Sequence, residues 1–384
     1  MDILCAEKPP WRYTQWVKSP PAVPPVSFQA WTTEPNQEVL ALKESIGALD
    51  REHKWELAKK MVNPYELVYT QNDDRLPPAL ALKQPLSRSY FKMVEMMEVL
   101  GIFAQPTKLR SAHVAEGPGG FIQALVERAG EKGSQVLAAT AMTLKPSTTH
   151  VPGWRKAAQF LQKNRQVTVH YGADGTGNIY VPANQESFIA ACAPGVNLFT
   201  ADGGFDFSVN YSQQEFKVFH LLLCSASIGL RVLRQGGSFV LKLFDLESPH
   251  TRTLVLLLGR HFTEWTLYKP AMTRPCNSER YFLGRGFRGT MNPIILEAQE
   301  KSAAGLYPVM DTATWTVTES AFLASHVETT TALQLHSIRQ AIVFSQDPEL
   351  WRRTWHRACI QKSYSWCEAF RIPAKPLAEF IKTP

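Results

Sequence analysis

Lys242 is a charged residue inside an otherwise apolar run, SFVLKLF (238–244). Burying such a charge is costly unless the amine has a partner or a task. Asp202 directly follows another apolar run, VNLFTA, and Glu279 lies in TRPCNSERY (273–281), just before a third. Taken singly, these residues are most often edge, turn and surface positions. If they meet at the carboxyl ends of neighbouring strands, an amine flanked by carboxylates could orient a hydroxyl group or take its proton.

A glycine-rich turn, HVAEGPGGF (113–121), is the second candidate for chemistry. Glycines at the carboxyl end of a strand let a ligand approach the backbone closely. The spacing is not the GxGxxG of a dinucleotide site, the GK[ST] of a P-loop is absent, and Pro118 has no N–H to offer a phosphate. An acid followed by a short glycine turn suits S-adenosylmethionine, which has no phosphate but carries an amino group and a sulfonium. The alternative is a tight strand–helix turn without a ligand.

The elements that must position these residues follow from the hydrophobic pattern. Strands that are apolar throughout and separated by helices imply an α/β fold with a mostly parallel sheet covered on both faces. The longest intervening helix is expected over 213–233, where apolar residues recur every three to five positions. The predicted strands are SAHVAE (111–116), QVLAATAM (135–142), QVTVHYG (166–172), VNLFTAD (196–202), GSFVLKLF (237–244), EWTLYK (264–269) and RYFLGR (280–285).

The flanking regions read differently. Residues 1–36 hold seven prolines and three tryptophans, which predicts an extended arm that lies against the body. Region 37–104 is predicted to be helical, with a helix over 37–62 and another that begins at Ser87 as N-cap and ends before Gly101. The α/β core is expected over 105–289, and 290–384 is expected to be a helical extension.

Composition bounds the class of protein without deciding it. The chain has 384 residues, a net charge of +7 and a pI of about 9.0, which is compatible with a polyanionic partner but common without one. Its six cysteines form no CxxC pair or zinc-spaced cluster, so we expect free thiols, a reducing compartment and no metal. No apolar run has the length of a membrane span, and the N-terminus lacks a signal-peptide pattern, so we expect a soluble intracellular protein.

Together, the runs EGPGGF, MTLKP, ADGGF, GGSFVLKLFDL and RPCNSERY resemble the FtsJ-like RNA 2'-O-ribose methyltransferases, and most closely the mRNA cap enzymes that modify the first transcribed nucleotide. The resemblance covers roughly residues 85–288. It implies a Rossmann-like, S-adenosylmethionine-dependent methyltransferase fold with a seven-stranded sheet and added terminal helices. It also implies a Lys-Asp-Lys-Glu tetrad, and SRSYFKM (87–93) matches the segment that supplies the first lysine. The implied catalytic residues are Lys92, Asp202, Lys242 and Glu279, with Lys83 as the competitor for the first lysine.

The resemblance also implies binding residues. YGADGTGNI (171–179) matches a segment whose acid, here Asp174, lies near the adenosine of the cofactor. Glu116 departs from the small residue or cysteine that is frequent at its position. The implied cofactor contacts are Glu116, Gly117, Pro118, Gly119, Gly120, Phe121, Asp174 and Asp202. The candidate RNA contacts are Arg88, Arg274, Asn277 and Ser278.

The function implied is methyl transfer from S-adenosylmethionine to the ribose 2'-OH of the first transcribed nucleotide of capped mRNA. The alternatives are another RNA position (the second cap nucleotide or ribosomal RNA) and a non-catalytic cap-binding scaffold. Lys242 would act as the base or, if it stays protonated, would steer the hydroxyl oxygen. The expected partner is capped RNA, with no membrane, no metal and a monomeric enzyme. The expected location is the nucleus for a cellular enzyme and the cytoplasm for a viral one.

Overall fold

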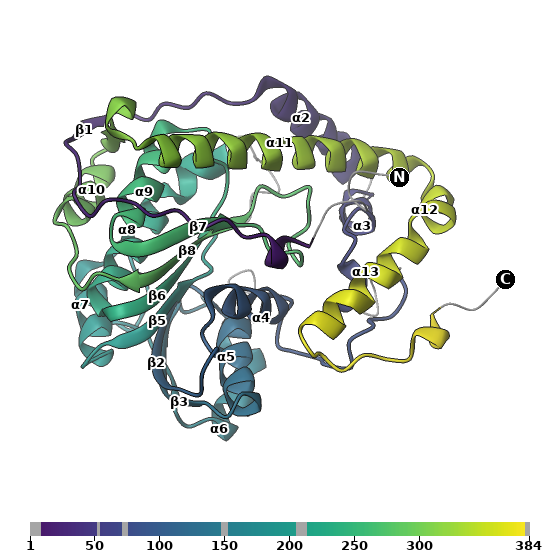
Figure 1. The fold of residues 1–384 in the computed structure, drawn as a ribbon, viewed down its shortest axis with the longest axis horizontal. Coiled ribbons are helices and arrows are strands. Elements are labelled where there is room, and N and C mark those ends of the chain that lie inside the picture. The colour runs from purple at the N-terminus through teal and green to yellow at the C-terminus, as the bar shows by residue number, and fades with distance from the viewer. Residues whose placement is uncertain (1–8, 52–53, 71–75, 147–152, 205–212, 381–384) are drawn as a thin grey trace.

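The computed structural model describes residues 9–51, 54–70, 76–146, 153–204 and 213–380. Seven strands form one sheet in the order β4-β3-β2-β5-β6-β8-β7, in which β8 runs antiparallel to both of its neighbours (Figure 1). The remaining neighbours pair in parallel, and β7 points the same way as these five strands, so the carboxyl ends of six strands share one edge. The strands are β2 (Lys108–Val114), β3 (Gln135–Met142), β4 (Val167–His170), β5 (Val196–Ala201), β6 (Leu233–Leu243), β7 (Phe262–Tyr268) and β8 (Arg280–Phe287).

All seven predicted strands are confirmed, with ends that differ by a few residues. Helices cover both faces of the sheet, as the uninterrupted apolar strands require. One hydrophobic cluster packs α7 (Pro182–Ala191), α8 (Gln214–Val232), α9 (Pro249–Gly259) and α10 (Ile294–Ala303) against one face. Another cluster packs α4 (Ser89–Leu100), α5 (Gly120–Glu131) and α6 (Ala158–Lys163) against the other.

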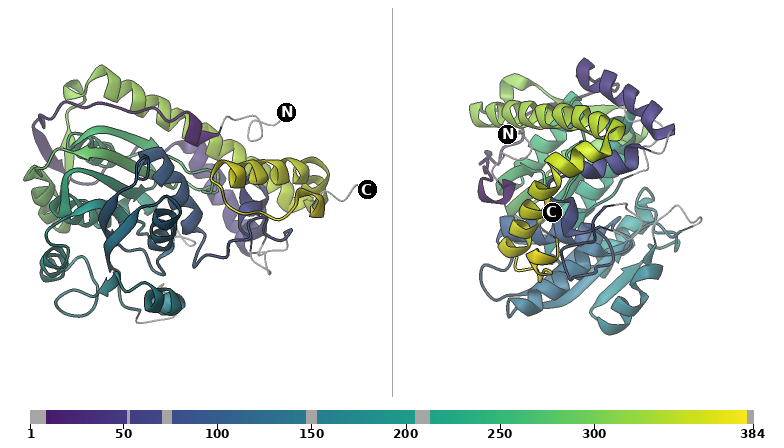
Figure 2. Two further views of the ribbon diagram at one scale, coloured as in Figure 1. Left: turned by 60° about the horizontal axis from the view of Figure 1, so that its bottom comes forward. Right: turned by 90° about the vertical axis from the view of Figure 1, so that its right-hand side faces the viewer.

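The two terminal regions pack on each other. A third cluster joins α2 (Gln37–Arg51) and α3 (Trp55–Met61) to α11 (Val317–Gln346), α12 (Pro348–Thr354) and α13 (His356–Ala369). Figures 1 and 2 show α3, α12 and α13 together at one side of the sheet, with the long α11 running across to them. Segments nearly 300 residues apart thus form one wall beside the strand ends, and no local pattern in the sequence could indicate that pairing.

The proline-rich arm lies against the body, as predicted. Val17 bridges to Trp265 on β7, and Trp31 packs its ring on Phe219 and His250. Within the arm, β1 (Val26–Gln29) pairs antiparallel with β9 (Tyr307–Met310) in a separate two-stranded sheet. The expectation of an entirely helical C-terminal region missed β9, because a four-residue strand that forms only with a distant partner has no local signature.

The prediction for α4 is confirmed at its C-terminal end and wrong at its N-terminal end. Gly101 ends α4 in the left-handed conformation, with a φ of 68°, as predicted. Ser87 is not the N-cap: Arg88 occupies that position, and the Ser87 hydroxyl contacts the hydroxyl of Ser89 at 2.6 Å.

Five cysteines are free and buried, while Cys5 lies outside the described residues. None of the described helices combines the length and apolarity that crossing a bilayer needs.

Candidate active site

The carboxyl ends of β2, β3, β5 and β6 open onto one cavity of about 810 Å³. This is the edge where ligands bind in open parallel sheets. One group of its lining residues comes from the strand-end turns, the loop after β4 and α8: Ala115, Gly117, Pro118, Thr143, Leu144, Gly177, Asn178, Ile179, Tyr180, Asp202, Gly203, Gly204 and Leu221. The other lining residues are Lys43, Ile46, Trp55, Lys59, Ser87, Arg88, Ser89, Gln214, Lys242, Phe244, Cys276, Asn277, Ser278, Glu279 and Gln334. We call these two groups of residues the glycine half and the basic half.

The glycine turn is shaped by close packing. Ala115 has a φ of 56°, and Gly119 has a φ of 97°, the left-handed region that glycine tolerates. A Cβ on Gly119 would lie 2.4 Å from the Trp154 ring, and one on Gly120 would lie 2.2 Å from the Ser89 hydroxyl oxygen. Only the first part of the turn, at Gly117 and Pro118, lines the cavity. The later glycines let α5 begin close to α4 and η3 (Trp154–Ala157).

Glu116 and Phe121 lie beneath this turn. The Glu116 carboxylate accepts a hydrogen bond from Thr200 and lies 3.2 Å from Nδ1 of His113, both of which are buried. Burial raises the pKa of Glu116, although His113 and Thr200 oppose the shift. Phe121 is buried and packs its ring on Tyr281 at 6.1 Å. Neither side chain lines the cavity, so direct contact of either with a cofactor stays a prediction.

The Asp174 carboxylate accepts hydrogen bonds from residues close to it in the sequence. Its Oδ1 accepts hydrogen bonds from the Thr176 amide at 2.8 Å, the Thr176 hydroxyl at 2.7 Å and the Asn184 amide nitrogen at 2.9 Å. These hydrogen bonds lower the pKa of Asp174. Asp174 does not line the cavity, whereas Asn178, Ile179 and Tyr180, which follow it, do. Its carboxylate therefore shapes the loop that presents those residues, and a contact with adenosine stays a prediction.

Lys242 and Asp202 form the first of two pairs in the cavity wall. Nζ of Lys242 donates to the backbone carbonyl of Asp202 at 2.8 Å and lies 3.3 Å from its Oδ1. Lys242 lies near the end of β6 and Asp202 directly after β5, and these strands are parallel neighbours. Burial lowers the pKa of Lys242, but the carboxylates of Asp202 and Glu279 outweigh it and place the pKa above its ordinary value. The amine is therefore protonated at neutral pH.

Lys92 and Glu279 form the second pair, with 2.5 Å between Nζ and Oε1. Burial raises the pKa of Glu279, but the ammonium groups of Lys92 and Lys242 lower it by more than burial raises it. The pKa therefore lies below its ordinary value, and the side chain is a carboxylate at neutral pH. The Tyr281 hydroxyl joins the pairs: it donates to Oδ1 of Asp202 at 2.7 Å and lies 3.2 Å from Oε1 of Glu279. Lys83 pairs instead with Glu127, at 2.6 Å. The structure thus brings all four predicted catalytic residues together.

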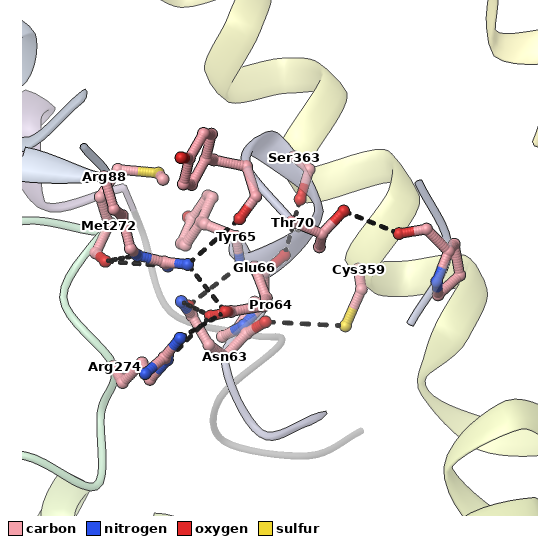
Figure 3. Close-up of polar contacts among 12 residues, drawn as sticks. Asn63, Pro64, Tyr65, Glu66, Thr70, Arg88, Met272, Arg274, Cys359 and Ser363 are labelled. Carbon is pink, nitrogen blue, oxygen red and sulfur yellow. Dashed lines mark hydrogen bonds and ion pairs between the residues drawn. The ribbon is translucent and has the colours of Figure 1, made fainter. Parts of the chain in front are cut away.

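The two arginines predicted to meet RNA are both held by Glu66 (Figure 3). Oε1 of Glu66 lies 2.8 Å from Nη1 of Arg88 and 2.9 Å from Nη2 of Arg274. Arg88 also donates to the carbonyl oxygen of Met272. Arg88 lines the cavity and Arg274 does not, while Asn277 and Ser278 do. Their contacts with substrate stay predictions.

Sequence reasoning passed over several residues of the site. Tyr281 stood inside the run TRPCNSERY, and Thr143 and Leu144 stood inside MTLKP, so a signal existed for each. Glu66 and Trp55 carried none, because their region of the chain matches no motif. Among the described residues, no group of His, Cys, Asp or Glu is arranged to hold a metal ion.

Gly177 gives a direct test of the glycine half. Its φ is 69°, and a Cβ there would lie 1.9 Å from the carbonyl oxygen of Thr143, at the cavity wall. Gly177→Ala should therefore displace the Thr143 backbone, and we expect at least about a tenfold weaker binding of S-adenosylmethionine, equivalent to 1.4 kcal/mol, by calorimetry. Gly175→Ala is the matched control, because Gly175 has a φ of 76° but no atom within 4 Å of that Cβ. Equal losses in the two variants would contradict the proposed role of the Gly177 contact.

A sheet of this order, with an antiparallel strand near one edge and a glycine turn at its carboxyl edge, is the Rossmann-like fold of the S-adenosylmethionine-dependent methyltransferases. The model of the FtsJ-like methyltransferase family matches residues 85–287, more than half of the 384 residues. The chain belongs to the FtsJ-like methyltransferase family.

Three similar proteins are named cap-specific mRNA (nucleoside-2'-O-)-methyltransferase 1. That of Leishmania braziliensis is 34% identical over 264 residues, which cover 63% of this chain and 64% of the relative. That of Trypanosoma cruzi is 33% identical over 222 residues, or 54% of this chain and 58% of the relative. That of Xenopus laevis is 34% identical over 186 residues, or 46% and 21%. The chain thus spans less than two thirds of the length of these relatives.

Proposed function

We propose that this protein transfers a methyl group from S-adenosylmethionine to the ribose 2'-OH of the first transcribed nucleotide of capped mRNA. The observation that carries the proposal is the pair of lysine–carboxylate contacts, Lys242–Asp202 and Lys92–Glu279, joined by Tyr281 beside the glycine turn. Family membership and the names of the three relatives support it. For a cellular enzyme, the proposal extends to action as a monomer in the nucleus.

The charge of the cavity supports one place for each ligand. Lys43, Lys59 and Arg88 line the basic half together with Lys242, whose ammonium group lies 3.3 Å from the Asp202 carboxylate, where the two groups of residues meet. A ligand with a sulfonium and an amino group is favoured near the Asp202 carboxylate and away from the other three cations. Phosphates of RNA are favoured near the lysines. When bound, the cofactor supplies its methyl group as an electrophile and becomes S-adenosylhomocysteine.

The chain's own residues orient the nucleophile. A protonated Lys242 donates a hydrogen bond to the 2'-oxygen and leaves a lone pair directed along the line of attack. Asp202 holds that ammonium group, and Lys92 and Glu279 hold the opposite side of the site through Tyr281. The oxygen gains its bond to carbon, and its proton leaves to water in the open cavity. The raised pKa of Lys242 supports the orienting role among the two that the sequence left open.

The experiment is methyl transfer from labelled S-adenosylmethionine to three short RNAs of one sequence. The first carries a cap, the second has none, and the third has a cap and a first ribose that is already methylated. We expect label in the first RNA alone, at its first ribose. Label in the third RNA would indicate the second cap nucleotide, label in the second would indicate a cap-independent target, and no label in any would favour a binding scaffold. Each of these outcomes would contradict the proposal.

A further inference from the structure

The loop that carries Glu279 is held through its backbone carbonyls. Residues 269–279 join β7 to β8 without regular secondary structure, so most of their carbonyl groups need donors other than helix or strand amides. Four consecutive carbonyls find them in side chains. The carbonyl of Cys276 accepts from Gln334 at 3.1 Å, that of Asn277 from Lys269 at 2.5 Å, that of Ser278 from Arg280 at 3.0 Å and that of Glu279 from Lys269 at 2.9 Å.

Lys269 supplies two of these four bonds with a single ammonium group. It follows β7 directly, and the pairing of β7 with β8 therefore fixes the backbone position from which its side chain extends. Both of its hydrogen bonds go to backbone carbonyls, so the side chain holds the loop itself. Lys269 also lines a second cavity, of about 330 Å³. Through that cavity, water can exchange protons with the amine.

We propose that Lys269 is a positioning residue of the reaction, which holds residues 277–279 so that Glu279 meets Lys92 and the 2'-hydroxyl. Its ammonium group does not touch the reacting atoms. It acts through its hydrogen bonds to the backbone carbonyls of Asn277 and Glu279. As far as it concerns catalysis, this inference rests on the proposed function. The bonds are charge-assisted, so they weaken when the lysine loses its proton.

The surroundings make that proton labile. Burial and, to a smaller extent, the positive charges of Arg280 and Lys92 lower the pKa of Lys269 to about 7, against partial opposition by Glu279. The other titratable groups that interact with it are Cys276 in the loop and His326 on α11. The pKa is shifted down, so the charged form predominates only below about pH 7. We therefore expect the hold on the loop to loosen as pH rises through that value.

The kinetic test compares Lys269→Met and Lys269→Arg with the unaltered protein in methyl transfer to capped RNA between pH 6 and 9. Misplacing a catalytic group by about 1 Å costs up to about 100-fold in rate, so Lys269→Met should lower kcat by about 10- to 100-fold at pH 6.5. The KM for S-adenosylmethionine should stay within about twofold, since the glycine half is untouched. Lys269→Arg stays charged and should restore part of the rate. It should also abolish the fall in kcat near pH 7.

Two control variants test whether the loss of kcat and its fall near pH 7 come from Lys269. Lys83→Met removes a lysine of the same size from a pair with Glu127 far from the loop, and it should leave kcat and its pH profile unchanged. Glu95→Gln removes the other nearby group with a pKa of about 7, whose Oε1 accepts from the Ala271 amide at 2.7 Å. The fall near pH 7 should persist in that variant. If it disappears there, or persists in Lys269→Arg, Lys269 is not its source and the proposal fails.

Hydrogen exchange separates this proposal from the function it rests on. In Lys269→Met, the amides of residues 277–280 should exchange at least about tenfold faster at pH 6.5, because the loop opens at a lower free-energy cost, while those of β5 keep their rates. This readout needs no activity. Unchanged exchange in the loop would overturn the positioning role even if methyl transfer occurs. If the unaltered protein methylates no RNA but the loop exchange rises, the proposed function fails while the structural role of Lys269 stands.

Discussion

Lys242→Ala is expected to lower kcat for methyl transfer by about 10²–10³-fold, the range for removal of one oriented hydrogen-bond donor at a reacting oxygen. The variant loses the ammonium group that would orient the 2'-oxygen, and it leaves Asp202 without the partner that lies 3.3 Å from its carboxylate. The glycine half, where we propose that the cofactor binds, keeps all of its side chains. The Kd for S-adenosylmethionine, measured by calorimetry, should therefore change by less than about threefold, or 0.7 kcal/mol.

Two further variants make this result specific. Lys242→Met keeps the apolar stem that packs near the Phe244 ring, 5.7 Å from Nζ, and should lose activity to the same extent as the alanine variant. Lys83→Ala removes a lysine outside the cavity and should keep full activity. If Lys242→Met retains more than about a tenth of the unaltered rate, well above what the loss of an oriented hydrogen-bond donor leaves, the ammonium group does not orient the hydroxyl.

Glu66→Gln is expected to destabilise the fold by about 3 kcal/mol, the lower end of the range for removing one partner of a buried ion pair. The lower end applies because the arginine side chains are 17% and 21% exposed, while that of Glu66 is 2% exposed. The amide leaves two guanidinium groups, of Arg88 and Arg274, without their shared carboxylate (Figure 3). Urea unfolding followed by tryptophan fluorescence would measure the loss.

The ion pairs of Glu66 with the two arginines should also make the free energy of unfolding depend on pH. Burial raises the pKa of Glu66, but Arg88 and Arg274 outweigh it, so its folded-state pKa lies below the ordinary 4.5. Its contribution is therefore present in full above pH 4.5 and is lost as pH falls through the folded-state value. Glu56→Gln is the matched control, because Glu56 is 61% exposed and its ion pair with Lys59 lies at the surface, and it should cost at most about 1 kcal/mol. Equal losses at the two glutamates would contradict the role given to Glu66.

Glu66 also shows why part of the site escaped prediction. Arg88 and Arg274 stand next to motif residues, so the sequence indicated them as candidates for RNA. Their common carboxylate comes from a 3-10 helix (Glu66–Val68) that resembles no motif. Only the packing of α3 and α13 brings that turn to the loop between β7 and β8. A single sequence carries no signal for a contact between residues 66 and 274, since neither periodicity nor spacing reaches across 208 positions.

The sequence by itself determined the strands and their carboxyl edge, and its motif resemblance indicated the four charged residues. Strand identity follows from short apolar runs, and parallel strands present their carboxyl ends at one edge, so Asp202 and Lys242 were expected at the same edge. The fold decided that their strands, β5 and β6, are direct neighbours. Tertiary structure alone decided what holds those residues: Tyr281 between the two pairs, Lys269 behind Glu279, and the wall of terminal helices that closes the basic half. These contacts depend on side-chain direction and on the packing of distant segments, which a linear pattern does not specify.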